Sequence, residues 1–184
     1  MQQWRHEALE RRYSAEQIRA RIDEMAAEIR RTYAELEGEL VLVSMLRGSL
    51  YFMADLSRAL DLPLEYDFIQ IAYHGDGEGS VRLAKDLETD IRGKHVLVLE
   101  EIMRTGLTTN YMIQELEQKS PTSLRLAVLF HNEDQLLMGL EPDFVGFSID
   151  WDELCGYGMD CQGQGRNLPY VCTLDEAALD RART

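Results

Sequence analysis

The residues best suited to chemistry lie in one run, from His95 to Thr109. Its first part is apolar and ends in two carboxylates, Glu100 and Glu101. A turn rich in threonine and glycine (105–109) then leads into a predicted helix. Carboxylates bind metal ions or sugar hydroxyls, and free N–H groups at a helix N-terminus bind phosphate. The run therefore predicts a site for a phosphorylated sugar that carries Mg²⁺.

Each of these features also has an ordinary structural interpretation. Glutamates at a strand end are often simply solvated, and neighbouring strand residues face opposite ways. Both carboxylates can therefore reach one ligand only if the strand has already ended before them. A glycine-threonine turn is a common helix start, and Arg47 beside Gly48 fits an ordinary surface turn as well as a pyrophosphate site.

The elements that position these residues follow from the spacing of apolar side chains. Ser14–Gln17 predicts a capping box, and helical spacing continues from there to Gly38. The second helix (50–60) has Leu50 on its apolar side, and the third covers about 105–119. Strands are predicted at 40–45, 65–72, 96–99, 124–130 and 144–149. This alternation predicts an α/β fold with a mainly parallel twisted sheet flanked by helices.

Composition narrows the function classes. The 184 residues fit one domain, or one domain with a small appendage. A net charge of −14, from 19 basic and 33 acidic residues, argues against binding to nucleic acid or to an anionic membrane. No apolar run has membrane-spanning length. Three cysteines without metal spacing, and an N-terminus that does not resemble a signal peptide, favour a cytoplasmic protein.

The order of these motifs resembles the type I phosphoribosyltransferases, and within them the hypoxanthine-guanine phosphoribosyltransferase family. The likeness covers about residues 39–174. The matching segments are 41–56, 96–108, 143–149, 156–160 and 166–170. The resemblance implies a sheet with a small hood built from the two ends of the chain. It divides the chain into an N-terminal helical segment (1–38), a phosphoribosyltransferase domain with its hood (39–174) and a C-terminal tail (175–184).

The resemblance assigns roles on the sugar-phosphate side by position. Glu100 and Glu101 are implied as catalytic residues that engage the ribose hydroxyls and a hydrated Mg²⁺, and Asp160 as a contact of a second Mg²⁺. The pyrophosphate loop, where the family has an unusual cis peptide, and the arginine that assists it are implied at Leu46, Arg47, Gly48 and Arg166. The 5′-phosphate is expected at Arg104, Thr105, Gly106, Leu107 and Thr108.

The base side departs from the family pattern. The base-binding positions implied by the resemblance are Asn132, Glu153 and Leu154, where Asn132 replaces a lysine and Glu153 replaces a stacking aromatic residue. Trp151 lies two positions away and could restore stacking. Arg104 stands where the family has the aspartate that handles the proton on purine N7. A guanidinium is always protonated and cannot act as a general base.

Tyr73 and the glycine-rich loop at 74–80 resemble the lid that closes over the reaction. The reaction passes through an oxocarbenium-like sugar cation that water would destroy, so a closing lid makes physical sense. The loop itself is expected to be a mobile loop or a hairpin arm.

The resemblance implies a Mg²⁺-dependent enzyme that transfers ribose 5-phosphate from phosphoribosyl pyrophosphate to hypoxanthine or guanine, in purine salvage. It also implies a homodimer or homotetramer. Two alternatives stay open because of Arg104, Asn132 and Glu153. The chain could use another acceptor base, or it could bind a nucleotide or phosphoribosyl pyrophosphate as a regulator without turnover.

Overall fold

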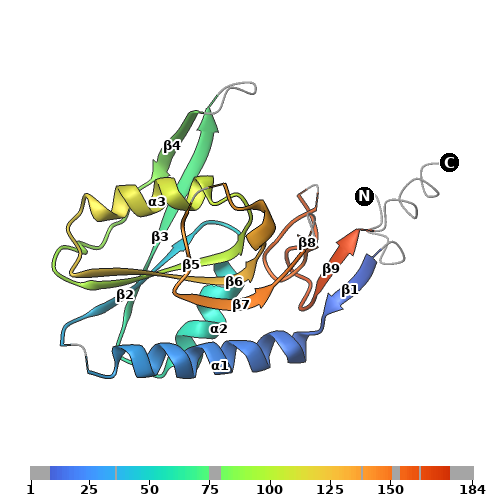
Figure 1. The fold of residues 1–184 in the computed structure, drawn as a ribbon, viewed down its shortest axis with the longest axis horizontal. Coiled ribbons are helices and arrows are strands. Elements are labelled where there is room, and N and C mark those ends of the chain that lie inside the picture. The colour runs from blue at the N-terminus through green and yellow to red at the C-terminus, as the bar shows by residue number, and fades with distance from the viewer. Residues whose placement is uncertain are drawn as a thin grey trace.

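The computed structural model describes residues 9–35, 37–74, 80–137, 139–150, 154–161 and 163–174. Its main feature is a six-stranded sheet in the order β4-β3-β2-β5-β6-β7 (Figure 1). All neighbours are parallel except β3 and β4, which are antiparallel. The strands are β2 (Leu40–Met45), β3 (Glu65–His74), β4 (Ser80–Lys85), β5 (His95–Met103), β6 (Ser123–His131) and β7 (Phe144–Ser148). The expected α/β fold is confirmed.

Helices cover both faces of this sheet. α1 (Ala15–Tyr33) and α2 (Leu50–Leu60) lie on one face, and α3 (Leu107–Glu117) lies on the other (Figure 1). A short 3₁₀ turn, η2 (Glu133–Gln135), follows β6. The predicted capping box is present at the start of α1, where the Gln17 amide donates to Ser14 Oγ (3.2 Å) and the Ser14 amide donates to Gln17 Oε1 (2.8 Å). The N-terminal helix therefore begins where the sequence predicts.

Side chains that alternate along the strands form two cores. Leu97 and Leu99 of β5 pack on the face of α1 and α2, whereas Val96 and Val98 pack on the face of α3. All four side chains are fully buried, as expected for a central strand of a parallel sheet. β5 is thus held from both sides, which makes it a rigid support for the residues at its carboxyl end.

A second, three-stranded antiparallel sheet forms the hood, in the order β1-β9-β8. Its strands are β1 (Leu9–Tyr13), β8 (Leu154–Cys155) and β9 (Val171–Leu174). It joins the N-terminal and C-terminal parts of the chain beyond one end of the main sheet (Figure 1). The resemblance implied a hood from both chain ends, but none of these strands was predicted individually. The division at residues 38 and 174 stays a proposal.

Several boundaries differ from the predictions. Leu50 was placed on the apolar side of its helix but is 47% exposed. β4 was not predicted, and α3 begins at Leu107 rather than at residue 105. The loop residues 75–79 and the tail 175–184 lie outside the described residues. In the described part of the chain, each helix is too short or too polar to cross a membrane.

The most consequential difference concerns β5, which was predicted to end at residue 99 but continues to Met103. Glu100 and Glu101 therefore lie within a strand. The alternation of faces breaks at this pair, because Ile102 packs with the core of Leu97 and Leu99, and Met103 lies in the core of the α3 face. The directions of Glu100 and Glu101 are therefore set by their own contacts.

Candidate active site

The site lies at the carboxyl ends of β2 and β5, which are parallel neighbours with Ser44 opposite Leu99. The loop that follows β2 therefore lies beside Glu100 and Glu101. This loop contains a cis peptide bond between Leu46 and Arg47, at the position implied by the resemblance. Ligands of open α/β sheets bind at this edge, beyond the carboxyl ends of the strands.

Glu100 points to the α3 face and is buried, with 4% of its surface exposed. The hydroxyl of Thr109, in the first turn of α3, donates a hydrogen bond to Glu100 Oε2 (3.0 Å). The pKa of Glu100 is raised to about 8, chiefly by burial and also by the neighbouring charge of Glu101, while the Thr109 hydroxyl opposes the shift. Glu100 is thus a buried carboxyl group with a hydroxyl donor of its own.

Glu101 points toward the loop after β2. A Cβ atom added to Gly48 would lie 1.5 Å from Glu101 Oε1, so only glycine leaves room for this carboxyl group. Oε2 of Glu101 is buried and has no hydrogen-bond partner among the described residues. Burial raises the pKa of Glu101 to about 7, Arg166 lowers it and Asp160 raises it.

A loop of the hood covers this carboxyl group from the other side of Gly48. A Cβ atom at Gly158 would lie 1.8 Å from the Gly48 carbonyl oxygen, so the two backbones touch. Arg166 Nη1 donates to the Gly158 carbonyl oxygen (2.7 Å), and Arg166 also forms an ion pair with Asp160. The structure thus brings together the residues predicted for pyrophosphate and for metal, although they come from β5, the β2–α2 loop and the hood.

The residues predicted for phosphate form the turn between β5 and α3. Gly106 is the N-cap of α3 and has φ +74°, a left-handed conformation that glycine adopts without strain. Arg104 and Leu107 are exposed, and the carbonyl oxygen of Thr105 accepts a hydrogen bond from the Leu137 amide (3.1 Å). An exposed helix N-terminus of this kind offers N–H groups to an anion.

On the predicted base side, Asn132 is 1% exposed, and its backbone N–H donates to the Met103 carbonyl oxygen (2.9 Å). Its Oδ1, like Nε2 of the preceding His131, is buried without a hydrogen-bond partner among the described residues. Leu154 lies in β8 and packs into the core on the α1–α2 face. Glu153, Trp151 and the side chain of Tyr73 lie outside the described part of the structure.

The carboxyl groups fit the Mg²⁺ that the resemblance implies. In the described part of the chain no group of three or more histidine, cysteine or acidic side chains could enclose a metal ion. Mg²⁺ in phosphoryl-transfer sites needs fewer protein ligands than this, because one or two carboxylates hold it together with water and substrate phosphates. Glu101 Oε2 has no hydrogen-bond partner among the described residues, and the pKa of Glu101 is raised. Both observations fit a carboxyl group whose negative charge a bound cation would compensate.

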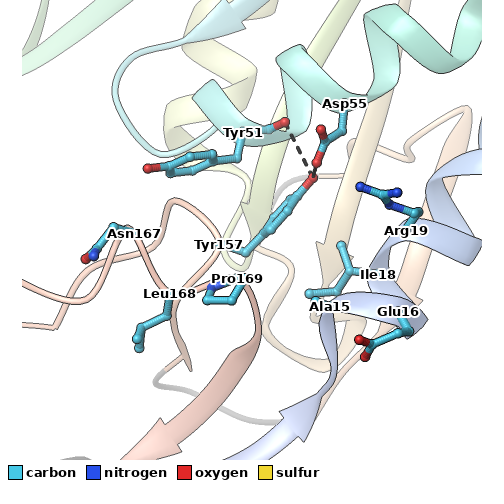
Figure 2. Close-up of a pocket in the computed structure, with 10 residues that line it drawn as sticks. All are labelled: Ala15, Glu16, Ile18, Arg19, Tyr51, Asp55, Tyr157, Asn167, Leu168 and Pro169. Carbon is cyan, nitrogen blue, oxygen red and sulfur yellow. Dashed lines mark hydrogen bonds between the residues drawn. The ribbon is translucent and has the colours of Figure 1, made fainter.

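Sequence reasoning missed two groups at this site. Thr109 ends the run that begins at His95 but received no role, because its burial against Glu100 is visible only in the fold. Tyr157 lies between two glycines of the hood and borders a pocket of about 390 Å³ between α1, α2 and the hood (Figure 2). Nothing in the sequence indicated that its side chain contacts α2.

Comparison with known proteins agrees with this geometry. A family model described as the phosphoribosyl transferase domain matches residues 12–159. A hypoxanthine-guanine phosphoribosyltransferase from Mycobacterium bovis is 37% identical over 88% of this chain and 84% of its own length. For a hypoxanthine phosphoribosyltransferase from Salmonella typhimurium the identity is 39%, over 84% of this chain and 89% of that protein.

Among solved structures, a mutant of the hypoxanthine phosphoribosyltransferase from Trypanosoma cruzi, complexed with the product IMP, has a TM-score of 0.90 and 32% identity. The match covers 99% of this chain and 100% of the other. It extends over the sheet, both helical layers and the hood. Sequence, fold and site geometry therefore agree: this chain is a type I phosphoribosyltransferase and belongs to the hypoxanthine-guanine phosphoribosyltransferase family.

Proposed function

We propose that this phosphoribosyltransferase transfers ribose 5-phosphate from phosphoribosyl pyrophosphate to a purine base, with hypoxanthine and guanine as acceptors. One observation carries the proposal. Two carboxyl groups, the buried Glu100 and the half-buried Glu101, lie near the carboxyl end of the central strand, between an open helix N-terminus and the loop at Gly48. The names of the relatives and the IMP bound to one of them support a purine acceptor.

In this proposal the 5′-phosphate binds at the turn from Arg104 to Thr108, where backbone N–H groups and hydroxyls at the start of α3 face it. Arg104 adds a positive charge at the same place. Glu100, held by Thr109, accepts a hydrogen bond from a ribose hydroxyl. The ribose is thereby oriented, and its C1 carbon is directed away from the phosphate turn toward Gly48.

The pyrophosphate binds on the opposite side, between Arg47, Gly48 and Arg166. Glu101 and Asp160 are the residues that would hold Mg²⁺, because Glu101 has an unpaired oxygen and Asp160 lies close enough to affect its pKa. When bound, Mg²⁺ supplies positive charge that offsets the charge of the pyrophosphate as it leaves. The bond from C1 to the pyrophosphate oxygen breaks, and a bond from C1 to a purine ring nitrogen forms.

The base binds near Asn132, Leu154 and Glu153. The buried amide of Asn132 can pair with a polar atom of the purine edge. Arg104 binds the 5′-phosphate in this scheme and does not accept the purine proton, because its guanidinium is already protonated. The proton that leaves the base therefore passes to water or to the leaving pyrophosphate, which predicts slow turnover.

The alternatives from the sequence were a regulator without turnover and an enzyme for another base. Relatives named as phosphoribosyltransferases for hypoxanthine or for hypoxanthine and guanine match 84–88% of the chain, and these names favour the purine enzyme. We further propose that the enzyme acts in the cytoplasm as a homodimer or homotetramer. Leu50 and Tyr51, exposed on α2 at 47% and 39%, would suit a contact between subunits.

The decisive experiment measures pyrophosphate release from phosphoribosyl pyrophosphate and Mg²⁺ with hypoxanthine, guanine or adenine as the acceptor. We expect release with hypoxanthine and guanine. Binding of phosphoribosyl pyrophosphate without release for any of the three bases would overturn the proposed function and favour the regulator.

The variant Arg104→Asp supplies a carboxylate that can accept the purine proton. We expect its kcat to rise by roughly tenfold or more, because general base catalysis is worth about 10²–10⁴, while its KM for phosphoribosyl pyrophosphate rises as well. Arg104→Asn is the matched control, since it removes the same charge without adding a base. An equal kcat for both variants would contradict the assignment of the missing base to this position.

A further inference from the structure

Tyr157 has an unusual backbone conformation in the hood loop that covers Gly48. Its φ is +46°, in the left-handed region that side chains other than glycine rarely adopt. Gly156 and Gly158 on either side have φ +103° and +99°, so three consecutive residues are left-handed. A tyrosine keeps such a conformation only where its surroundings hold it.

The side chain of Tyr157 shows what holds it. Its hydroxyl donates a hydrogen bond to Asp55 Oδ2 (2.5 Å) and lies 3.4 Å from the carbonyl oxygen of Tyr51, and both partners belong to α2 (Figure 2). The residue is only 7% exposed. Burial and the Asp55 carboxylate both raise the pKa of the phenol, so the hydroxyl keeps its proton and remains a donor.

The backbone next to Tyr157 touches the pyrophosphate loop. The Tyr157 amide donates to the Leu168 carbonyl oxygen (2.9 Å), and the next residue, Gly158, rests on the Gly48 carbonyl oxygen. Gly48 in turn contacts the carboxyl group of Glu101. The loop from Leu46 to Ser49 is therefore enclosed between the hood above and Glu101 below, and α2 begins directly after it.

The side chain of Tyr157 thus links the hood, which touches this loop, to α2, which follows it in the chain. α2 fixes the loop by chain connection, the hood fixes it by contact, and the Tyr157–Asp55 hydrogen bond sets the spacing between α2 and the hood. The pocket around this bond is lined by both parts, with Tyr51 and Asp55 from α2 and Leu168 and Pro169 from the hood (Figure 2).

We propose that Tyr157, through its hydrogen bond to Asp55, is a positioning residue for the pyrophosphate half of the reaction. It holds Gly158 on Gly48 and so keeps the loop and the Glu101 carboxyl group in the arrangement that receives pyrophosphate. The inference rests on the proposed function for the identity of the ligand. It concerns neither the base nor the 5′-phosphate, which lie at other elements.

The test compares Tyr157→Phe with the parent enzyme. Phenylalanine keeps the ring and removes only the hydroxyl. A hydrogen bond to a charged group is worth about tenfold in an equilibrium constant, so we expect the KM for phosphoribosyl pyrophosphate to rise about tenfold, with the KM for the purine unchanged within about twofold. Calorimetry should show the same rise in the Kd for phosphoribosyl pyrophosphate with Mg²⁺, whether or not the enzyme turns over.

Three further variants separate positioning from general packing. Tyr51→Phe removes a hydroxyl that points away from Tyr157 in the same pocket, and it should leave the Kd unchanged (Figure 2). Asp55→Asn keeps an accepting oxygen and should retain most of the affinity. Asp55→Ala should weaken binding as Tyr157→Phe does, and the double variant Tyr157→Phe, Asp55→Ala should be no weaker than either single one.

A lower melting temperature of Tyr157→Phe with unchanged KM and Kd would overturn the inference and leave Tyr157 a packing residue. So would equal increases in the KM values for both substrates. A parent protein that binds phosphoribosyl pyrophosphate but releases no pyrophosphate would instead refute the proposed function, and the Kd values would still decide the role of Tyr157.

Discussion

Glu100 and Glu101 are neighbours in the chain, yet their surroundings differ. Glu100 faces the α3 layer and accepts a hydrogen bond from Thr109. Glu101 faces the β2–α2 loop, with one oxygen against Gly48 and the other unpaired among the described residues. Glu100 is buried, Glu101 is half-buried with a buried Oε2, and both have a raised pKa.

The difference follows from what each side chain meets at the end of β5: the first turn of α3 for Glu100 and the backbone of Gly48 for Glu101. A buried carboxyl group with its own donor is suited to orient a sugar hydroxyl. One with an unpaired oxygen beside a glycine backbone is suited to a cation and a phosphate. One strand therefore serves two halves of the site, and the two halves should respond differently to substitution.

The largest expected loss of activity follows from a substitution at Gly48, beside Glu101. The variant Gly48→Ala places a Cβ atom 1.5 Å from the present position of Glu101 Oε1, so the carboxyl group or the loop must move. A displacement of about 1 Å in a catalytic site costs roughly 100-fold in rate, and we expect at least this loss in kcat/KM for phosphoribosyl pyrophosphate. Gly139→Ala is the control, since a Cβ atom there meets nothing within 4 Å. Comparable activity of the two variants would disprove the close approach.

An effect of intermediate size is expected when the stability of the folded protein is measured as a function of pH. A carboxyl group with a higher pKa in the folded protein binds more protons when folded, so stability falls as pH rises from about 4.5 toward about 7 for Glu101 and about 8 for Glu100. Each pKa unit corresponds to about 1.4 kcal/mol. The melting temperature should therefore fall between about pH 5 and about pH 8, and less so in Glu100→Gln or Glu101→Gln than in the parent.

Binding of Mg²⁺ with pyrophosphate tests the same comparison at about pH 8, where Glu101 has lost most of its protons and Glu100 about half. The pair of ligands should raise the melting temperature of the parent and of Glu100→Gln, since both keep the carboxylate at position 101. Glu101→Gln should show little increase. Loss of the increase in Glu100→Gln alone would reverse the roles assigned to the two carboxyl groups.

The smallest effect is expected on the α3 side. Thr109→Val keeps the shape of the side chain but removes the hydroxyl that donates to Glu100 Oε2. An unsatisfied buried group costs about 1–3 kcal/mol, so we expect a loss of this size in the free energy of unfolding by urea. The kcat/KM should fall by no more than about threefold, because Glu100 stays in place. A loss as large as that of Gly48→Ala would make the α3 side the critical half.

Elements that carry their own signal were predictable from the sequence. The capping box at Ser14 and Gln17 marks the start of α1, and the apolar run at 40–45 marks β2 because both faces of that strand are buried. The glutamates, the arginines and the glycine-threonine turn could be named as site residues because their side chains have an evident chemistry. The roles assigned to them, and those assigned to the base-side residues, stay predictions.

Features that depend on distant contacts could not be predicted. β1 reads Leu-Glu-Arg-Arg-Tyr, without an apolar pattern, and it becomes a strand only by pairing with residues 171–174. β8 has two residues, too few for any period. The contact of Gly158 with Gly48, and the length of β5 beyond Leu99, likewise arise from segments that meet only in the folded chain.

The pairing of β1 with β9 also sets the order in which the protein can be assembled during synthesis. β9 is the last described strand, and one of its two partners, β1, lies at residues 9–13, near the other end of the described chain. The main sheet is complete once β7 has left the ribosome, whereas the hood must wait for residues 171–174. A nascent chain thus exposes the carboxyl group of Glu101 before the hood loop beside it has formed.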